Sequence, residues 1–261
     1  MLRRRLRAML SRAEDACVAP VRMAQLAQEV GFPSGALNVV TGIGEEAGAA
    51  LASHPGIDFL SFTGSPEVGT LVQRSIYDKF VAQVVARFKQ LRVGSHAMDL
   101  DCGPLISENQ KKRVHSFIDR AKKDGIPVLA EAQIADGVPS GGFYVAPVLF
   151  GPVPRDNALA CDEVFGPVLS IIAFEDEADA VKLANATECG LVAGIWTRDG
   201  ARQMRVAKKM RCGQVFVNGY GAGGGIELPF GGVKKSGHGR EKGMEALHEF
   251  SHTKTIVFKH G

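Results

Sequence analysis

Apolar residues recur along this chain with two periods, and the two periods alternate from residue 20 onward. Stretches with helical spacing of apolar positions are separated by short apolar runs rich in Val, Ile and Phe. Alternation of this kind is typical of an α/β fold, with parallel strands joined by right-handed crossovers. We therefore expect an α/β chain, and its sequence contains no internal repeat and no low-complexity linker.

The N-terminal third predicts a succession of short elements. In order, we expect a helix from Pro20 to the Gly31-Phe32-Pro33 stop, a strand over 36–40, a helix over 42–53, a strand over 57–62 and a helix starting at Ser65-Pro66. The pattern resumes after residue 91 with a Ser107–Gln110 capping box, which opens a helix running to about Lys123 and ending at Gly125. Further strands are expected near 126–131, 143–149, 167–174, 191–197 and 214–218, further helices near 177–185, 200–210 and 242–249, and a β-rich tail over 253–259.

The region between residues 66 and 91 does not fit one helix. On a helical wheel, Val68, Leu71 and Val72 fall on one side. The remaining apolar residues, Tyr77, Phe80, Val81, Val84, Phe88 and Leu91, centre on the opposite side. We interpret the region as two helices with different packing partners, joined near residues 73–74 where a segment is missing.

Composition narrows the class of protein. With 261 residues, 45% hydrophobic and 23% charged, the chain is of ordinary globular type with room for one large or two small domains. No apolar run approaches the ~18 residues of a transmembrane helix. The five cysteines are dispersed without a CxxC pair, which argues against a disulfide framework or zinc ribbon and favours a reducing, cytoplasmic setting.

Positive charge is concentrated at the N-terminus. Residues 1–12 hold five arginines and no acid, with Leu2, Leu6 and Leu10 at helical spacing. A targeting or membrane-surface helix and an arm that does not pack on the fold both remain open, and we favour the second. Without these arginines the chain carries 26 basic and 28 acidic residues, so we expect no nucleic-acid partner and no membrane partner.

Two glycine-bearing turns are candidates for phosphate binding. The first spans Gly42 to Gly48 and is weak, because glycines at a helix start are more often plain turn residues. The second spans 62–69, where Gly64 permits close backbone approach, Ser65 can cap a helix and Pro66 suits its first turn. The free N–H groups of such a helix start attract a pyrophosphate, although a capped helix needs no ligand.

Longer motifs resemble the NAD(P)-dependent aldehyde dehydrogenases. They are Gly31-Phe-Pro-Ser-Gly-Ala-Leu-Asn-Val-Val, His54-Pro-Gly-Ile-Asp58, Ser61-Phe-Thr-Gly-Ser65, Glu163-Val-Phe-Gly-Pro-Val168 and Pro229-Phe-Gly-Gly-Val-Lys-Lys-Ser-Gly-His-Gly-Arg-Glu241. The motifs occur in the family's order and span about residues 13–259. The resemblance implies a partial Rossmann-like cofactor domain followed by an α/β aldehyde dehydrogenase catalytic domain.

The resemblance also implies roles for individual residues. Gly64, Ser65, Pro66, Glu67, Val68 and Gly69 match the turn and helix start that receive the cofactor pyrophosphate. Glu163 matches the carboxylate that binds the nicotinamide ribose hydroxyls, and Phe165 matches the ring beside it. Without the family context, Glu163 would be a loop carboxylate and Phe165 a core aromatic. Phe230 falls near the family's substrate region, and a packing role is an equal alternative.

The family's reacting groups have no match here. In the family, a general-base glutamate in a Glu-Leu-Gly-Gly context and a nucleophilic cysteine lie between the Phe-Thr-Gly-Ser turn and a Tyr-Asp-x-Phe helix. In this chain Ser65 is followed within a dozen residues by Tyr77-Asp-Lys-Phe80. The oxyanion asparagine, an adenosine-side lysine and the oligomer-forming hairpin precede the family's equivalent of residue 13. We therefore assign no catalytic residue and expect weak NAD or NADP binding.

Other candidates do not replace the missing nucleophile. Cys161 lies two residues before Glu163, but adjacent Asp162 opposes a thiolate, and no basic residue stands beside it. The histidines show no metal-ligand spacing except His248 with His252, which straddle a helix end, so we expect no metal site.

Domain boundaries and partners follow from these expectations. We expect a basic arm over 1–12, a partial NAD(P)-binding domain over 13–73, a catalytic-type domain over 74–252 and a C-terminal strand over 253–261. The substrate implied is an aldehyde, and its identity and the choice between NAD and NADP stay open. Two alternatives are retained activity and a non-catalytic subunit that pairs with a full-length homologue through 253–259. An unpaired edge near 57–62 predicts aggregation or oligomerisation.

Overall fold

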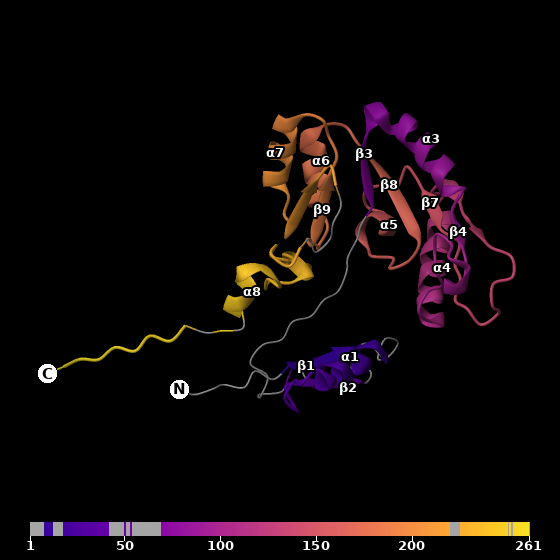
Figure 1. Cartoon of the computed structure of the whole chain (residues 1–261). Helices are drawn as coiled ribbons and strands as arrows, with labels where there is room; N and C mark the ends of the chain where they lie inside the picture. Colours follow the sequence, from indigo (N-terminus) through magenta and orange to yellow (C-terminus); the bar gives the residue numbers. More distant parts are fainter. Residues whose placement is uncertain are drawn as a thin grey trace. The chain divides into compact units, whose positions relative to one another are not determined.

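The computed structural model describes residues 8–12, 18–41, 50, 53, 69–219, 225–249, 251 and 253–260. The chain divides into two compact units, Met1–Ser61 and Phe62–Gly261, and each is described by itself (Figure 1). Several expected features lie outside the described residues: the helix over 42–53 apart from two of its positions, the strand over 57–62, and Gly64–Val68.

The smaller unit contains a parallel strand pair and one helix. Strand β1 (Ala8–Arg12) pairs with β2 (Leu37–Thr41), and helix α1 (Val18–Glu29) packs against β2. The helix and β2 were predicted from the sequence, and Pro20 lies in the first turn, where its missing N–H needs no partner. The arm prediction was wrong for residues 8–12, because backbone hydrogen bonds to a strand 29 positions downstream hold them in a ladder.

The larger unit is built on a four-stranded sheet with the order β3-β8-β7-β5. These strands are Thr70–Gln73, Val168–Phe174, Val148–Phe150 and Val128–Glu131. Strand β8 is parallel to both β3 and β7, while β5 is antiparallel to β7. Two smaller parallel pairs accompany this sheet: β4 (Arg92–Val93) with β6 (Gln133–Ile134), and β9 (Val192–Ile195) with β10 (Gln214–Val217).

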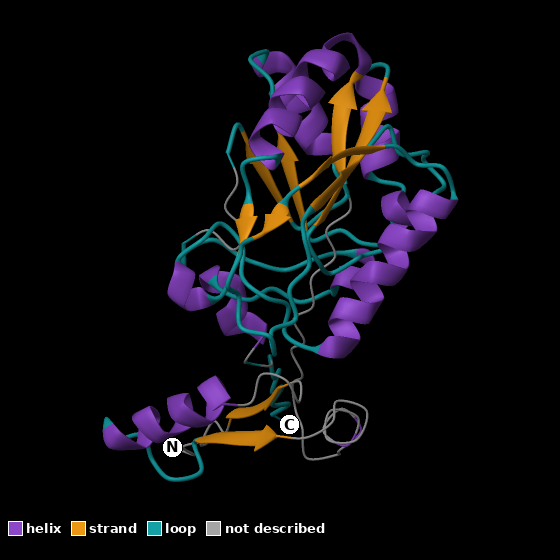
Figure 2. Cartoon of the chain, turned by 90° about the vertical axis from the view of Figure 1, so that its right-hand side faces the viewer, coloured by secondary structure: helices purple, strands orange, loops and turns teal. Residues whose placement is uncertain are grey.

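Helices cover the strands of this unit (Figure 2). They are α3 (Tyr77–Phe88), α4 (Glu108–Lys123), α5 (Ala158–Cys161), α6 (Glu177–Ala184), α7 (Gly200–Lys209) and α8 (Gly243–Glu249), with short 3-10 turns at Arg74–Ile76, His96–Met98 and Lys234–Ser236. Most of these bounds agree with the sequence within a few residues, and α5, β4 and β6 were not predicted. No helix among the described residues is long and apolar enough to cross a membrane.

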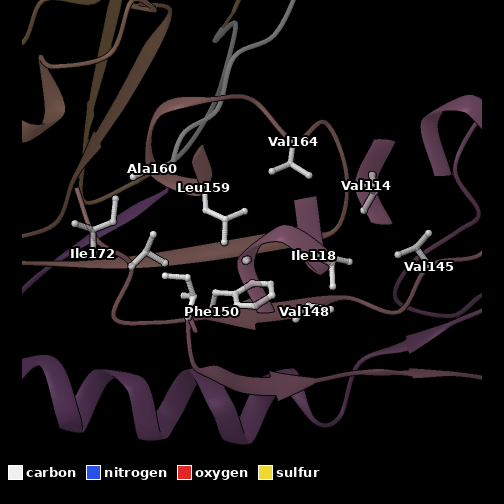
Figure 3. Packing of buried hydrophobic residues seen from close by; sticks show 12 residues of the cluster. Val114, Ile118, Val145, Val148, Phe150, Leu159, Ala160, Val164 and Ile172 are labelled. Atoms are coloured by element: carbon white, nitrogen blue, oxygen red, sulfur yellow. The ribbon is translucent and has the colours of Figure 1, made fainter. Parts of the chain in front are cut away.

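Two hydrophobic cores lie on the two faces of the four-stranded sheet. One is formed with α4 and α5, and Figure 3 shows Phe150 and Leu159 among its side chains. The other lies under α3, whose apolar stripe of Tyr77, Phe80, Val81, Val84 and Phe88 packs on Leu149 and Ile171. This stripe confirms the helix face that the sequence predicted.

Two helices were expected between residues 66 and 91, and the prediction of the first was wrong for residues 70–73. These residues form β3, so Leu71 packs against one core and Val72 belongs to the other. Alternation along a strand sends neighbouring side chains to opposite faces, which two adjacent apolar residues of a helix cannot do. Strand β3 belongs to the larger unit through its pairing with β8. Gly69 is the residue immediately before it.

The C-terminal strand was also not found. Residues 253–260 belong to no helix or strand, and all of them are exposed. A strand needs a neighbouring ladder, and these residues pair with no described strand.

Candidate functional site

A cavity of about 330 Å³ lies in the larger unit, on the side of the sheet that carries α4 and α5. Nine residues line it: Gly69, Leu159, Asp162, Glu163, Val164, Phe165, Gly166, Val168 and Ser170. Three of them, Gly69, Glu163 and Phe165, were singled out from the sequence. The first two are 94 positions apart in the chain, and the pairing of β3 with β8 brings them together.

Gly69 closes one part of the cavity wall. Its φ is +62°, in the left-handed region that favours glycine. A Cβ at this position would lie 3.2 Å from Ile172 Cδ1 and 3.4 Å from the Ser170 carbonyl oxygen. The backbone can therefore approach β8 closely only because residue 69 has no side chain. The other five residues of the expected pyrophosphate turn, Gly64–Val68, lie outside the described residues.

The opposite part of the wall is the loop from Asp162 to Gly166, between α5 and β8. Phe165 adopts φ +58°, an uncommon conformation for an aromatic residue, and it is 57% exposed. Gly166 lies directly on α4, since a Cβ there would come within 2.3 Å of Val114 Cγ2. The loop is thus pressed against the helix at one end and presents an aromatic ring to solvent beside Glu163.

Helix α4 holds this loop by hydrogen bonds to its backbone. Gln110 Nε2 donates to the carbonyl oxygens of Phe165 and Val164, the latter at 3.5 Å. Arg113 Nη2 donates to the Glu163 carbonyl over 2.6 Å, while its guanidinium carbon lies 5.3 Å from the centre of the Phe117 ring. Three successive loop carbonyls are therefore fixed from one helix.

The predicted N-cap of α4 explains how Gln110 reaches the loop. Ser107 caps the helix and accepts a hydrogen bond from the Gln110 backbone N–H at 3.3 Å. In a full capping box the third helical side chain would reach back toward the cap. Here the Gln110 side chain instead turns to the site loop. The sequence thus predicted the cap and missed the second role of Gln110.

None of the nine residues that line the cavity is a cysteine. Cys161, at the end of α5, is exposed, and its Sγ donates to the Arg155 carbonyl over 3.5 Å. Burial, with Asp101 nearby, raises the pKa of the Cys102 thiol, and burial also raises the pKa of Cys212. A raised pKa leaves less thiolate, so neither group is set up as a nucleophile.

Phe230 lies apart from the cavity lining. Its backbone exchanges two 2.6 Å hydrogen bonds with Glu241, and Lys242 Nζ lies 5.5 Å from the centre of its ring. These contacts are local, and they leave open the choice between a packing role and a substrate role. Among the described residues there is no cluster of three or more metal-ligating side chains.

Ser170 is a lining residue that the sequence analysis missed. It is 4% exposed and is the buried polar residue of the part of the chain that the structure describes. A signal for it exists in the sequence, since Ser170 is the polar member of the otherwise apolar run Val168–Phe174. A polar residue at a core-facing strand position breaks the expected apolar pattern and therefore indicates a candidate functional residue.

Comparison with known proteins gives a consistent result. The model described as the aldehyde dehydrogenase family matches residues 8–73 and 70–256. The two matched segments overlap at 70–73, which is β3. A curated aldehyde dehydrogenase of Emericella nidulans is 32% identical over 310 aligned positions, which cover 97% of this chain and 62% of that protein. Because 310 exceeds the chain's own length of 261, several dozen of those positions have no residue here.

Solved structures agree with this match. The structure of a Burkholderia cenocepacia protein assigned as an aldehyde dehydrogenase is similar with a TM-score of 0.90 and 47% identity, covering 98% of this chain and 65% of that one. An aldehyde dehydrogenase of Bacillus cereus, solved as an NAD+ complex, has a TM-score of 0.86 and 28% identity, covering 96% and 62%. The chain thus spans less than two thirds of the length of each of these three relatives.

Proposed function

Because the chain belongs to the aldehyde dehydrogenase family, we propose that it keeps the nicotinamide end of the family's NAD(P) site but does not oxidise aldehydes. The described residues of the cavity fit one end of such a cofactor. A volume of about 330 Å³ is near the lower limit of ligand pockets, which suits a ring and a sugar rather than a whole dinucleotide. The close backbone approach at Gly69 provides a narrow wall for a flat ring.

Two lining residues and two residues of α4 have defined tasks in this proposal. The Glu163 carboxylate accepts hydrogen bonds from ribose hydroxyls, and the Phe165 ring packs beside the sugar. Gln110 and Arg113 keep the loop backbone in place, so that these two side chains are preorganised. The cofactor, when bound, supplies the hydride-accepting ring, and the choice between NAD and NADP depends on residues outside this cavity.

The proposed loss of aldehyde oxidation rests on one observation: the cavity beside Glu163 has no thiol among its lining residues. The sequence supports it, because only eleven residues separate Ser65 from Tyr77, and none of them is a cysteine. The overlap of the two family matches at 70–73 supports a junction at β3, so we place the start of the catalytic-type domain before Thr70. A carbonyl carbon bound there would meet no thiol among the described lining residues to form a covalent intermediate.

Cofactor binding is tested by titrating the purified chain with NADH and following the reduced ring's fluorescence. We expect saturable binding that Glu163→Gln weakens by about tenfold, because a charged acceptor is lost. Glu131→Gln is the matched control, since Glu131 is an exposed carboxylate on β5 away from the cavity lining. Absence of NADH binding, or equal affinities for both variants, would overturn the proposal.

Loss of activity is tested with a panel of aliphatic and aromatic aldehydes and both oxidised cofactors. We expect no formation of reduced cofactor above the rate without protein. Formation of NADH or NADPH that disappears after thiol alkylation would identify a working cysteine and contradict the proposal.

A second candidate function is a non-catalytic subunit that pairs with a full-length relative. The observation that favours it is the extended tail over 253–260, where Ile256, Val257 and Phe258 are 68%, 83% and 77% exposed. An extended apolar segment of this kind can add to a sheet edge. Co-expression with a full-length family member of the same organism should give a complex that a chain ending at residue 252 does not form. A monomeric species in both cases would contradict this function.

We also propose that the chain functions in a reducing, cytoplasmic compartment. The four cysteines that the structure describes are all free thiols, in agreement with an intracellular redox environment.

A further inference from the structure

The Ser170 side chain occupies a position where the fold calls for an apolar residue. On β8 it lies between Val168 and Ile172, which share its face of the sheet and pack in the core under α4 and α5. Its neighbours on the other face, Leu169 and Ile171, pack under α3. Ser170 therefore interrupts an apolar stripe in the middle of the central strand.

The hydroxyl of Ser170 has no hydrogen-bond partner among the described residues, although the residue is only 4% exposed. The hydroxyl oxygen is not among the fully buried side-chain oxygens without a partner, so it meets the open space of the cavity. Core packing does not account for the residue, because Ser is smaller than the apolar residues on either side. The side chain borders the cavity, so a bound ligand can supply the missing partner.

The surroundings of Ser170 limit what that ligand group can be. Gly69, Leu159 and Val168 line the cavity with it and carry no polar side-chain atom. A Cβ on Gly69 would lie 3.8 Å from Ser170 Cβ, so residue 69 lies close to Ser170. Because Asp162 and Glu163 line the same cavity, an anionic group is disfavoured there, whereas a flat ring with a single neutral polar substituent suits the hydroxyl and the apolar residues beside it.

We propose that the Ser170 hydroxyl hydrogen-bonds the carboxamide of a nicotinamide ring bound in this cavity. The proposal rests on the proposed function, since it assigns the ring end of the same cofactor to Ser170 while Glu163 takes the sugar. A primary amide is neutral and offers both an acceptor oxygen and donor N–H groups, so either orientation of the hydroxyl is satisfied. Ser170 is then a binding residue of the site.

The binding test compares Ser170→Ala with the unaltered chain. We expect the affinity for NADH to fall about two- to tenfold, the usual net effect of one neutral hydrogen bond. ADP-ribose, which lacks the nicotinamide, is the probe for the rest of the site, and its affinity should not change. Ser170→Thr keeps the hydroxyl and should retain more of the NADH affinity than Ser170→Ala does. That result would show that NADH affinity depends on the hydroxyl and not on the cavity volume.

A stability measurement separates binding from a structural role. Without ligand, we expect Ser170→Ala to leave the thermal unfolding midpoint unchanged or slightly raised, because the hydroxyl bonds no described residue and faces the cavity. Ser236→Ala is the matched control: Ser236 Oγ accepts a 2.9 Å hydrogen bond from the Gly190 N–H, so its loss should lower the midpoint and leave NADH affinity unchanged.

The outcomes are distinguishable. If the unaltered chain fails to bind NADH, the proposed function and this inference both fall. If it binds and Glu163→Gln weakens binding while Ser170→Ala does not, the inference about Ser170 alone is overturned. A fall in the unfolding midpoint of Ser170→Ala would also overturn it, since the hydroxyl would then serve the fold. Equal losses of NADH and ADP-ribose affinity would show that Ser170 does not contact the ring.

Discussion

Arg113 Nη2 donates a 2.6 Å hydrogen bond to the backbone carbonyl of Glu163, which lies 50 positions further along the chain. The contact joins helix α4 to the loop that borders the cavity. It acts on the backbone of Glu163 and so helps to fix where this residue stands. With Gln110 on the same helix, it makes α4 the support of the site loop.

Replacing Arg113 tests this support. We expect Arg113→Gln to weaken NADH binding by about fivefold, near the 1 kcal/mol net value of one hydrogen bond, because the loop loses its anchor at Glu163. The change in the unfolding midpoint should be small, since the side chain is on the surface. Arg120→Gln is the control: Arg120 is on the same helix, 65% exposed, and forms a loose 3.9 Å ion pair with Asp124. Equal affinities for the two variants would contradict a positioning role.

Gly166 gives a second test of the contact between loop and helix. A Cβ at this position would approach Val114 Cγ2 within 2.3 Å, and Val114 is fully buried, so it cannot move aside freely. We expect Gly166→Ala to lower the free energy of unfolding by roughly 1–3 kcal/mol, as overpacked core positions do. Urea denaturation measures this loss. At Gly103 a Cβ would meet nothing within 4 Å, so Gly103→Ala should change stability far less.

At Phe165, a substitution should weaken cofactor binding without lowering stability. Its φ of +58° disfavours an aromatic side chain, whereas asparagine tolerates this region well. We expect Phe165→Asn to leave the free energy of unfolding unchanged or raise it by up to about 1 kcal/mol. The same variant should bind NADH severalfold more weakly, because the exposed ring beside Glu163 is lost. Unchanged NADH affinity would show that the ring does not contact the cofactor.

Local sequence signals predicted the elements whose causes are local. Ser107 accepts from the Gln110 N–H, Asp176 from the Asp179 N–H and Asp199 from the Arg202 N–H, so each predicted helix start coincides with a side-chain cap. Strand β8 was predicted from its apolar run, and the α3 stripe from its spacing. In each case a few neighbouring residues hold enough information to fix the element.

Elements that depend on distant partners were predicted poorly. Leu71-Val72 suits a helix or a strand equally, and only the pairing of β3 with β8, about 100 positions away, decides between them. Residues 8–12 likewise become a strand through β2. The site shows the same limit: the family resemblance pointed to Glu163 and Phe165, but their closeness to Gly69 and Ser170 follows from strand order, which no local pattern contains.

Two arginine–carboxylate pairs at the start of α6 make stability depend on pH. Arg205 bonds Glu177 through two nitrogens at 3.1 and 2.8 Å, and Arg155 bonds Asp179 at 2.8 and 2.7 Å. The hydrogen bonds from Arg205 lower the pKa of Glu177, and those from Arg155 lower the pKa of Asp179. A carboxyl whose folded-state pKa is depressed adds stability above its unfolded pKa and loses it as pH falls through the folded value.

We therefore expect the unfolding midpoint of the chain to fall as pH decreases from about 5, just above the usual pKa of these acids, to about 3. Arg205→Gln should be less stable than the unaltered chain at neutral pH, although Arg202 still lies 3.7 Å from Glu177. At the acid end the two should be nearly equal, because Glu177 is then protonated and its pair with Arg205 is lost in the unaltered chain too. Both pairs are on the surface, so the difference should be small and should shrink in high salt. Arg211→Gln, which removes an exposed arginine without an ion pair among the described residues, should follow the pH profile of the unaltered chain. Parallel profiles for Arg205→Gln and the unaltered chain would show that the Glu177 pair contributes nothing to the pH dependence.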